Sequence, residues 1–490
     1  MLGILITKEF KNIIQSPKFV STFLTCTVLI LLSVYIGIQE YNDAVRQFEI
    51  GNSITEQSVR EQTAWGQVQN QVFRKPSPLQ IFVSGINNDI GRLTTVSEWQ
   101  SIKLRNSHYS DNPVFAVFRF IDLTFIFMIV MSLFAIIFTY DAVNGEREGG
   151  TLKLVFSNSV SRAKFLIAKF IGSWVGLVVP VLFSLLLGLL MVILFNIELS
   201  ASDWTNIISL LGISILFFTF FICLGLCISA LTPKSSTSFM ILLVLWIAIV
   251  LILPRIGIMV AGEVIHVPTI AETESKKEGF TRERWDRFST EMSKVWEERN
   301  REVQNTSSDE NAQQAYRESK EWEWLEKDDE ARKKVNAEIA EYTRKLSEDL
   351  RNAKALQEEL GLNISRFSPA SSYLLASMNL SGSDVGLKSR YESALENYKK
   401  TYSQFVQQKQ KESGQSGGIR ISMDTRKGFS FQTDEGTKIL NPADMPKFVY
   451  DDTVQQSSFG LVAVDVCLLL AYSIMAFFAA FLLFLKYDVR

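Results

Sequence analysis

The side chains best placed to do chemistry are gathered in one short polar stretch between two long apolar segments. From Tyr140 to Leu154 the chain reads Tyr-Asp-Ala-Val-Asn-Gly-Glu-Arg-Glu-Gly-Gly-Thr-Leu-Lys-Leu. Acidic residues followed by a Gly–Gly break and a short amphipathic piece make a polar protrusion at a membrane surface. Such a protrusion can dock into a partner, and Arg162 and Lys164 can pair with carboxylates or lipid headgroups. The chemistry expected here is binding.

The motifs of common catalytic and nucleotide-binding sites are missing from the sequence. It contains no GxxxxGK[ST] phosphate loop and no HExxH or CxxC pattern. Two histidines and four cysteines leave little material for a metal site, and a net charge of −2 gives no reason to expect nucleic-acid binding. We therefore expect neither an enzyme activity nor a metal or cofactor in this chain.

Among the charged residues in or near the apolar segments, four are candidates for a translocation path or for intramembrane pairing. Asp465 lies about two turns into the last segment, Arg119 and Asp122 lie near the start of the second, and Arg255 closely follows the fifth. A charge at the centre of a bilayer costs on the order of 2.5–3.5 kcal/mol on insertion scales, so Asp465 should face protein or water. Two interpretations stay open: a translocation-path or gating residue, and a buried ion pair with Arg119 or Arg255.

Six apolar segments must position these residues, and each is long enough to cross a hydrocarbon core about 30 Å thick as a helix. They run over 19–38, 118–140, 165–195, 207–231, 238–253 and 458–485. Pro180 predicts a kink or tilt in the third segment. The fifth ends at Pro254 unless it continues to about residue 261. The expected fold class is an all-α polytopic membrane protein with six transmembrane helices.

The first 18 residues interleave apolar side chains with Lys8, Lys11 and Lys18. This spacing favours an amphipathic helix in the membrane interface, in contact with lipid, over a disordered basic start. The segment 19–38 has too long an apolar region for a cleaved signal peptide. Gly172 and Gly176 form a GxxxG pattern that would let two helices approach closely, although a single instance is weak.

The charge of the short loops predicts the orientation. The segments 1–18, 141–164, 232–237 and 486–490 hold ten basic and five acidic residues, whereas the hairpin 196–206 on the other side has two acids and no base. The positive-inside rule therefore places both termini and the segment 141–164 in the cytoplasm. The segments 39–117 and 262–457 are then external. All four cysteines lie in apolar segments, which leaves none in the external parts to oxidise.

The larger external segment, 262–457, is predicted to be mainly helical with a small β element. Between Glu263 and Asp452 the sequence has 35 of its 52 acids and 30 of its 50 bases, which marks solvated helix faces. Apolar stripes at helical spacing run from Val335 to Leu350 and from Tyr391 to Phe405. A Gly/Ser-rich break at 413–418 precedes two short strands at 419–423 and 428–432.

The segment 141–164 closely resembles the coupling region of ABC type-2 permeases, "YDAxxGExExGTLKLxxSxxxSRxxxxxxKxxG". The matching residues are Asp141, Gly145, Glu146, Glu148, Gly150, Thr151, Leu152, Ser157, Ser161, Arg162, Lys169 and Gly172. The resemblance covers the whole chain in outline and is greatest to the subgroup with large external loops, which includes permeases of gliding-motility and nitrous-oxide-reductase maturation systems. The domain of roughly 200 residues after the fifth span departs from the usual, shorter permease.

The resemblance implies a permease subunit in a bacterial inner membrane that works with cytoplasmic ABC ATPase subunits and a second permease copy. ATP and Mg would be bound by the ATPase. The ATPase-coupling residues would be Asp141, Gly145, Glu146, Arg147, Glu148, Gly150, Thr151, Leu152 and Arg162, with Glu146 and Glu148 facing the ATPase. An alternative stays open: a mechanotransmission or scaffold protein that drives a periplasmic partner without moving substrate through the bilayer.

Overall fold

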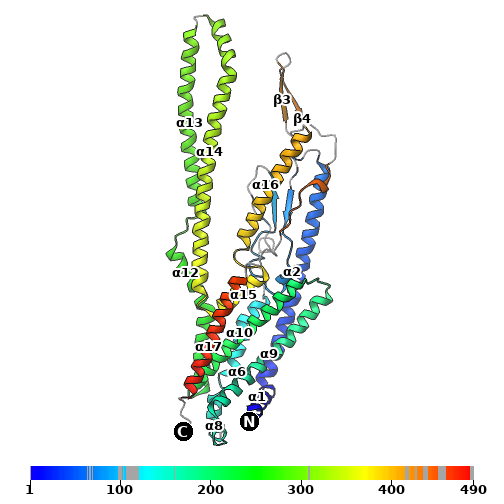
Figure 1. Ribbon diagram of the computed structural model, residues 1–490, viewed down its shortest axis with the longest axis vertical. Coiled ribbons are helices and arrows are strands. Elements are labelled where there is room, and N and C mark those ends of the chain that lie inside the picture. The colour runs from blue at the N-terminus through cyan, green and yellow to red at the C-terminus, as the bar shows by residue number, and fades with distance from the viewer. Residues whose placement is uncertain are drawn as a thin grey trace. The chain divides into compact units, whose positions relative to one another are not determined.

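The computed structural model describes residues 2–62, 65, 68, 70–97, 102, 104–105, 121–158, 160–306, 309–413, 419–424, 428–433, 440–450 and 459–485. Most of these residues are helical, and the described strands form two antiparallel pairs (Figure 1). The strands are β1 (Asn70–Phe73), paired with β2 (Leu93–Val96), and β3 (Ile419–Asp424), paired with β4 (Gly428–Thr433). The helices, in chain order, are α1 (Leu2–Ile14), α2 (Pro17–Glu61), η2 (Pro78–Ile81), α5 (Leu123–Phe125), η3 (Ile126–Met131), α6 (Ser132–Thr139), α7 (Asn144–Glu148), α8 (Thr151–Ser157), α9 (Arg162–Leu194), α10 (Ala201–Leu231), α11 (Ser235–Trp246), η4 (Ile247–Ile252), α12 (Leu253–Val264), α13 (Ile270–Thr306), α14 (Glu310–Ser365), α15 (Pro369–Ser381), α16 (Leu387–Ser413), η5 (Pro442–Asp444) and α17 (Phe459–Leu485).

Six helical stretches among the described residues are long and apolar enough to cross a membrane, which confirms the predicted fold class. The second begins only at Leu123, because Asp122 is the N-cap residue and its carboxylate accepts the Phe125 N–H at 2.8 Å. The fifth continues beyond Pro254 to Val264. The six residues before α12 form the π-helix η4, and this wider turn gives room to the proline ring.

Two compact units make up the chain: residues 1–252 with 366–490, and residues 253–365. In the first unit, α10 packs against α6, α15 and α17. A Cβ added at Gly225 of α10 would lie 1.8 Å from Thr139 Oγ1, so only glycine permits this approach to α6. Helix α15 is buried along nearly its whole length, although it is far less apolar than the spans around it. These contacts place one continuous apolar core in the first unit.

A second apolar cluster in the same unit joins α16 to the β1–β2 pair. The predicted stripe on α16 is its buried face, and Tyr391 and Leu395 are fully enclosed. The Tyr398 hydroxyl accepts a hydrogen bond from Asn70 Nδ2 at 2.7 Å and donates one to the Pro446 carbonyl at 2.6 Å. This one side chain therefore ties together three distant parts of the sequence.

The second unit contains α12 and the long hairpin of α13 and α14, whose helices run side by side in Figure 1. Arg299 forms two hydrogen bonds with Asp328, and the rings of Phe280 and Tyr342 stack at 4.0 Å. Charged side chains along each helix also pair with one another, and hydrogen bonds from two lysines lower the pKa of Glu323 to about 2. The range 262–457, expected as one external domain, is thus shared between two units.

Candidate functional site

The segment 141–164 folds into two short helices at one end of the helices α6 and α9. Helix α7 ends at Glu148 with Gly149 as its C-cap residue, and Gly150 joins it to α8 with a φ of +69°, a left-handed conformation that favours glycine. Leu152 is 2% exposed and holds α8 against the core. Helix α9 then begins after Ser161, whose hydroxyl accepts the Lys164 N–H. The predicted Gly–Gly break is therefore a sharp corner between helices.

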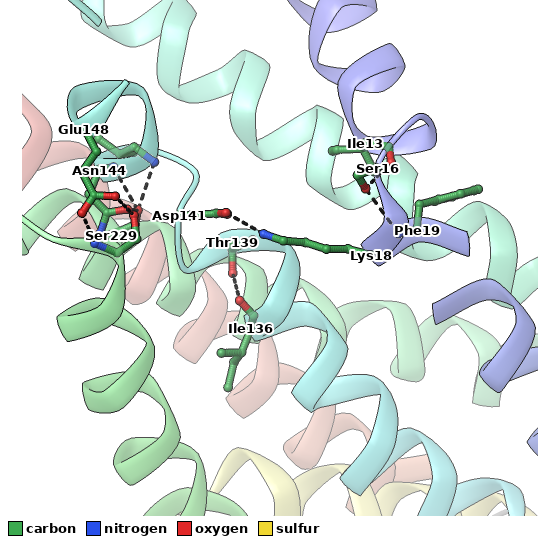
Figure 2. Close-up of polar contacts among 12 residues, drawn as sticks. Ile13, Ser16, Lys18, Phe19, Ile136, Thr139, Asp141, Asn144, Glu148 and Ser229 are labelled. Carbon is green, nitrogen blue, oxygen red and sulfur yellow. Dashed lines mark hydrogen bonds and ion pairs between the residues drawn. The ribbon is translucent and has the colours of Figure 1, made fainter. Parts of the chain in front are cut away.

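Asn144 anchors the start of α7 to the end of α10. Its side chain is fully buried. The hydroxyl of Ser229 on α10 donates to Asn144 Oδ1 at 3.2 Å (Figure 2). The same hydroxyl accepts the Val143 N–H at 3.0 Å, and Asn144 Nδ2 donates to Thr232 Oγ1 at 3.1 Å. A buried and satisfied polar network of this kind specifies one arrangement of the helices that it joins.

Glu148 connects α7 to the start of α11. Its Oε1 accepts the Ser235 N–H at 2.9 Å, and its Oε2 accepts the Ser235 hydroxyl at 2.7 Å. Ser235 is the first residue of α11, so the carboxylate satisfies a backbone N–H that the helix itself leaves free. A negative charge there also interacts favourably with the helix dipole.

Glu146 connects α7 to α9 and α1 through Lys169. The Lys169 ammonium lies 3.0 Å from Glu146 Oε1 and 2.9 Å from Glu9 Oε1. The three side chains are only 8–14% exposed. Thr151 of α8 donates its hydroxyl to the same Glu146 side chain. Inside this chain, then, the carboxylate of Glu146 is turned toward the helices behind it.

Asp141 links the segment to α2. Figure 2 shows the ion pair between Lys18 and Asp141. The Lys18 ammonium lies 2.5 Å from Asp141 Oδ2 and 4.5 Å from the centre of the Tyr140 ring. Both charged side chains are about one-third exposed. Together with the contacts above, five helices hold the segment: α1, α2, α9, α10 and α11.

The two glycines of the GxxxG pattern receive α1. A Cβ added at Gly172 would lie 2.7 Å from the Glu9 Cβ, and one added at Gly176 would lie 2.7 Å from Ile13 Cγ2. Helix α1 thus packs so closely on α9 that side chains at these two positions would separate them.

A surface of the segment stays exposed, and we call residues 149–154 without Leu152 the tip. Leu154 is 65% exposed, and Gly149, Gly150, Thr151 and Lys153 are exposed as well. Arg147 and Glu148 border the tip and are also exposed. Arg162 donates to the Leu485 carbonyl at the end of α17. The tip combines a bulky apolar side chain, a cation and bare backbone, which suits docking into a protein partner.

The predicted intramembrane charges are not gathered in one place. Besides capping its helix, the Asp122 carboxylate accepts the N–H and hydroxyl of Ser84, each at 3.2 Å. Asp465 is fully buried, and its ion-pair partner is Arg366, at 2.7 Å, instead of the expected Arg119 or Arg255. Arg255 is an exposed residue of α12. Arg119 lies outside the residues that the structure describes.

Several residues of the site were not singled out from the sequence. Asn144, Ser229 and Ser235 carry the network behind α7, and Arg366 pairs with Asp465. Asn144 lies within the quoted pattern, but its partners are about 85–91 residues away. A polar residue in the middle of an apolar run, such as Ser229, is the signal that could have indicated a buried contact.

Comparisons with known proteins agree with this architecture. A family model described as "ABC-2 family transporter protein" matches residues 4–489, nearly the whole chain. The chain is also similar to a probable ABC transporter permease protein, NosY, of Pseudomonas aeruginosa, with 29% identity over 132 residues. That region covers 27% of this chain and 48% of the relative. Because the family model spans almost every residue, the chain belongs to the ABC-2 family of transporter proteins.

Proposed function

We propose that this chain is the membrane-spanning permease subunit of an ATP-binding-cassette transporter, in which a separate subunit hydrolyses ATP. Family membership and the similarity to a probable permease support this function. The excess of basic residues in the short loops supports a cytoplasmic position for both termini and for the segment 141–164. In this orientation the tip faces the compartment that contains ATP.

The observation that carries the proposal is that one side of the segment 141–164 is bonded to other helices of the chain, while its tip is exposed. Asn144, Glu146 and Glu148 fix α7 to α1 and to the helices α9, α10 and α11 of three different spans, while the tip has an exposed leucine. A part that transmits force needs both properties, because a loosely held loop would absorb the movement of its partner. The role of Glu146 and Glu148 is then to hold the segment rigid, and the tip makes the contact with the ATPase.

The coupling follows from these connections. A displacement of the tip by closing ATPase subunits would move α7, and α7 would pull on α9 and α1 through Lys169 and on α11 through Ser235. The spans would then exchange between two arrangements, and export of a substrate would accompany the exchange. A second copy of the chain, or a related one, would complete the pathway.

The test is ATPase capture with a matched pair of variants. Leu154→Asp places a charge on the tip, and Leu356→Asp makes the same change at a leucine of α14 that is 58% exposed, against 65% for Leu154. With the neighbouring ABC ATPase co-expressed, Leu154→Asp should lower its recovery at least about tenfold, because a charge buried in an interface without a partner is costly. With Leu356→Asp, the recovery of the ATPase should be the same as with the unaltered chain. Equal recovery with both variants would contradict docking through the tip.

The hairpin α13–α14 favours a second candidate function, in which the chain works a periplasmic partner without moving substrate through the bilayer. Its two helices have 37 and 56 residues, with Trp296 60% and Trp322 83% exposed. Exposed tryptophans are typical of sites that bind other proteins. Reconstituted vesicles distinguish the two functions. ATP-driven movement of a substrate favours the permease, and stimulation of ATP hydrolysis by a periplasmic protein alone favours the transmitter.

A further inference from the structure

The chain passes between its two compact units at two places, after Ile252 and before Arg366. The second place is marked by an ion pair within the first unit. Arg366 Nε lies 2.7 Å from Asp465 Oδ1, and Nη2 lies 3.4 Å from Oδ2. The Asp465 side chain is fully buried and that of Arg366 is 14% exposed. Removing either partner would leave the other charge buried and uncompensated, so the contact strongly fixes Arg366 to α17.

The backbone of Arg366 is held by the same helix. The Tyr472 hydroxyl donates to the Arg366 carbonyl at 2.9 Å. Tyr472 follows Asp465 by seven residues, two helical turns, so both side chains project from one face of α17. Arg366 is therefore bound by α17 both at its guanidinium and at its backbone carbonyl. We call Arg366, Asp465 and Tyr472 the clamp.

The place where the chain leaves the first unit, after Ile252, is hydrogen-bonded to a residue next to the clamp. Ser368, two residues after Arg366, donates its hydroxyl to the Ile249 carbonyl at 2.5 Å. Ile249 belongs to η4, and a π-helical turn changes the partners of the backbone carbonyls, so a side-chain donor is useful there. The chain leaves the first unit after Ile252 and returns to it at Arg366. Within that unit, the residues next to these two points are bonded to each other through Ser368 and Ile249, and Arg366 is bonded to α17.

We propose that the clamp couples the sixth span to the hairpin α13–α14, so that movement of α17 during the ATPase cycle is transmitted to the hairpin. The inference rests on the proposed function and adds to it the residues that carry the movement outward. A carboxylate engaged in this way is not available to a passing substrate, which argues against a translocation-path role for Asp465. Arg366 acts here as a positioning residue.

Covalent continuity makes the coupling effective. Ser365 is the last residue of α14 and Arg366 is the next residue of the chain, so a movement of Arg366 is passed directly to α14. Helix α14 has 56 residues, which at about 1.5 Å per residue gives a length of about 84 Å. A tilt of about 5° at its base would therefore move its far end by about 7 Å. Within unit 2, Ser365 Oγ also donates to the Pro254 carbonyl at 3.0 Å, which stiffens that base.

The experiment measures movement of the hairpin in the full complex with ATPase subunits in lipid nanodiscs. Spin labels are placed at Trp322→Cys on the hairpin and Ile208→Cys on α10, two exposed positions, after the four native cysteines are replaced by alanine. Labelled chain is diluted with unlabelled chain so that only distances within one copy are seen. The label–label distance is compared without nucleotide and with ATP and vanadate. ATP hydrolysis is measured on the same samples.

Three variants separate the clamp from general damage. Asp465→Asn removes the charge at nearly constant volume, and Arg366→Asp with Asp465→Arg exchanges the two charges. Asp328→Asn is the matched control, because it removes the comparable pair with Arg299 inside the hairpin. We expect Asp465→Asn to lose most of the nucleotide-dependent shift while retaining at least about half of the ATP hydrolysis. The exchanged pair should regain part of the shift, and Asp328→Asn should keep it.

The contrary results are distinct. A full shift in Asp465→Asn, or ATP hydrolysis by the unaltered complex without any shift, would overturn the coupling role and leave the proposed function intact. Failure of the unaltered chain to bind an ATPase would overturn the proposed function, and the inference with it. If Asp465→Asn does not assemble, Tyr472→Phe removes one hydrogen bond of the clamp without leaving a charge unpaired. It should reduce the shift, and an undiminished shift would again refute the clamp.

Discussion

Substitution of Gly172 by alanine tests the packing that holds α1 on α9. The new Cβ would lie 2.7 Å from the Glu9 Cβ, which is attached directly to the backbone of α1 and cannot rotate away. Carbon atoms in contact prefer separations of about 3.5–4.0 Å, so α1 must retreat by about 1 Å. Glu9 is also the residue that pairs with Lys169 at 2.9 Å, and the same displacement lengthens that contact.

The magnitude follows from three contributions. Overpacking of this kind costs about 1–3 kcal/mol. Weakening a hydrogen bond between charged groups costs up to about 1.5–3 kcal/mol, and less when it is only lengthened. Alanine is better than glycine inside a helix by about 1 kcal/mol, which opposes the first two. We therefore expect Gly172→Ala to destabilise the protein by roughly 1–3 kcal/mol.

Thermal unfolding in detergent, followed by tryptophan fluorescence, measures this effect. The control is Gly212→Ala in α10, where an added Cβ meets no atom of the described residues within 4 Å. That change should be neutral or stabilise the protein by up to about 1 kcal/mol. The two alanine variants should thus shift the transition in opposite directions. If Gly172→Ala unfolds at the same temperature as Gly212→Ala or above it, the close packing of α1 on α9 is refuted.

Three further predictions use the same assay. Asp122→Ala removes an N-cap and should destabilise the protein by about 1–2 kcal/mol, whereas Asp122→Asn should retain most of the stability; equal losses would contradict capping. Tyr391→Phe should be neutral or stabilising, because the buried hydroxyl has no hydrogen-bond partner among the described residues. Tyr398→Phe loses two hydrogen bonds and should cost about 1–3 kcal/mol, and a larger loss with Tyr391→Phe than with Tyr398→Phe would contradict this reasoning. Asp141→Asn should cost only about 0–1 kcal/mol, because its pair with Lys18 is one-third exposed, and a loss well above that would show a larger role.

The spans could be predicted from the sequence because the bilayer imposes a length and a polarity that the six apolar segments display directly. The residues at which the spans begin and end were harder to predict. The second span was expected to start at 118, but Asp122 begins the helix as its cap, a signal that is present in the sequence as an acid just before an apolar run. The continuation past Pro254 depends on the π-helix η4, and no pattern of residue types reports such a turn.

The segment 141–164 was recognised from its residues, but not what its side chains contact. Glu9 and Glu146 meet at Lys169, although Glu9 is 160 residues before it in the chain. The partner of Asp465 was expected to be Arg119 or Arg255, but it is Arg366. The sequence of one helix does not indicate which distant part of the chain packs beside that helix. Long-range pairing of this kind is decided by packing of the whole unit, and it is where the reasoning from sequence ended.

The π-helix η3 determines the direction, around the helix axis, in which the later side chains of the second span point. Residues 126–131 hold more residues per turn than an α-helix, and one extra residue rotates the rest of the helix by about 100°. Deleting a single residue from this turn would swing Thr139 away from Gly225, and Asp141 and Asn144 away from their partners. The direction in which the segment 141–164 faces is thus set some ten to fifteen residues earlier, by a π-helical turn outside the segment.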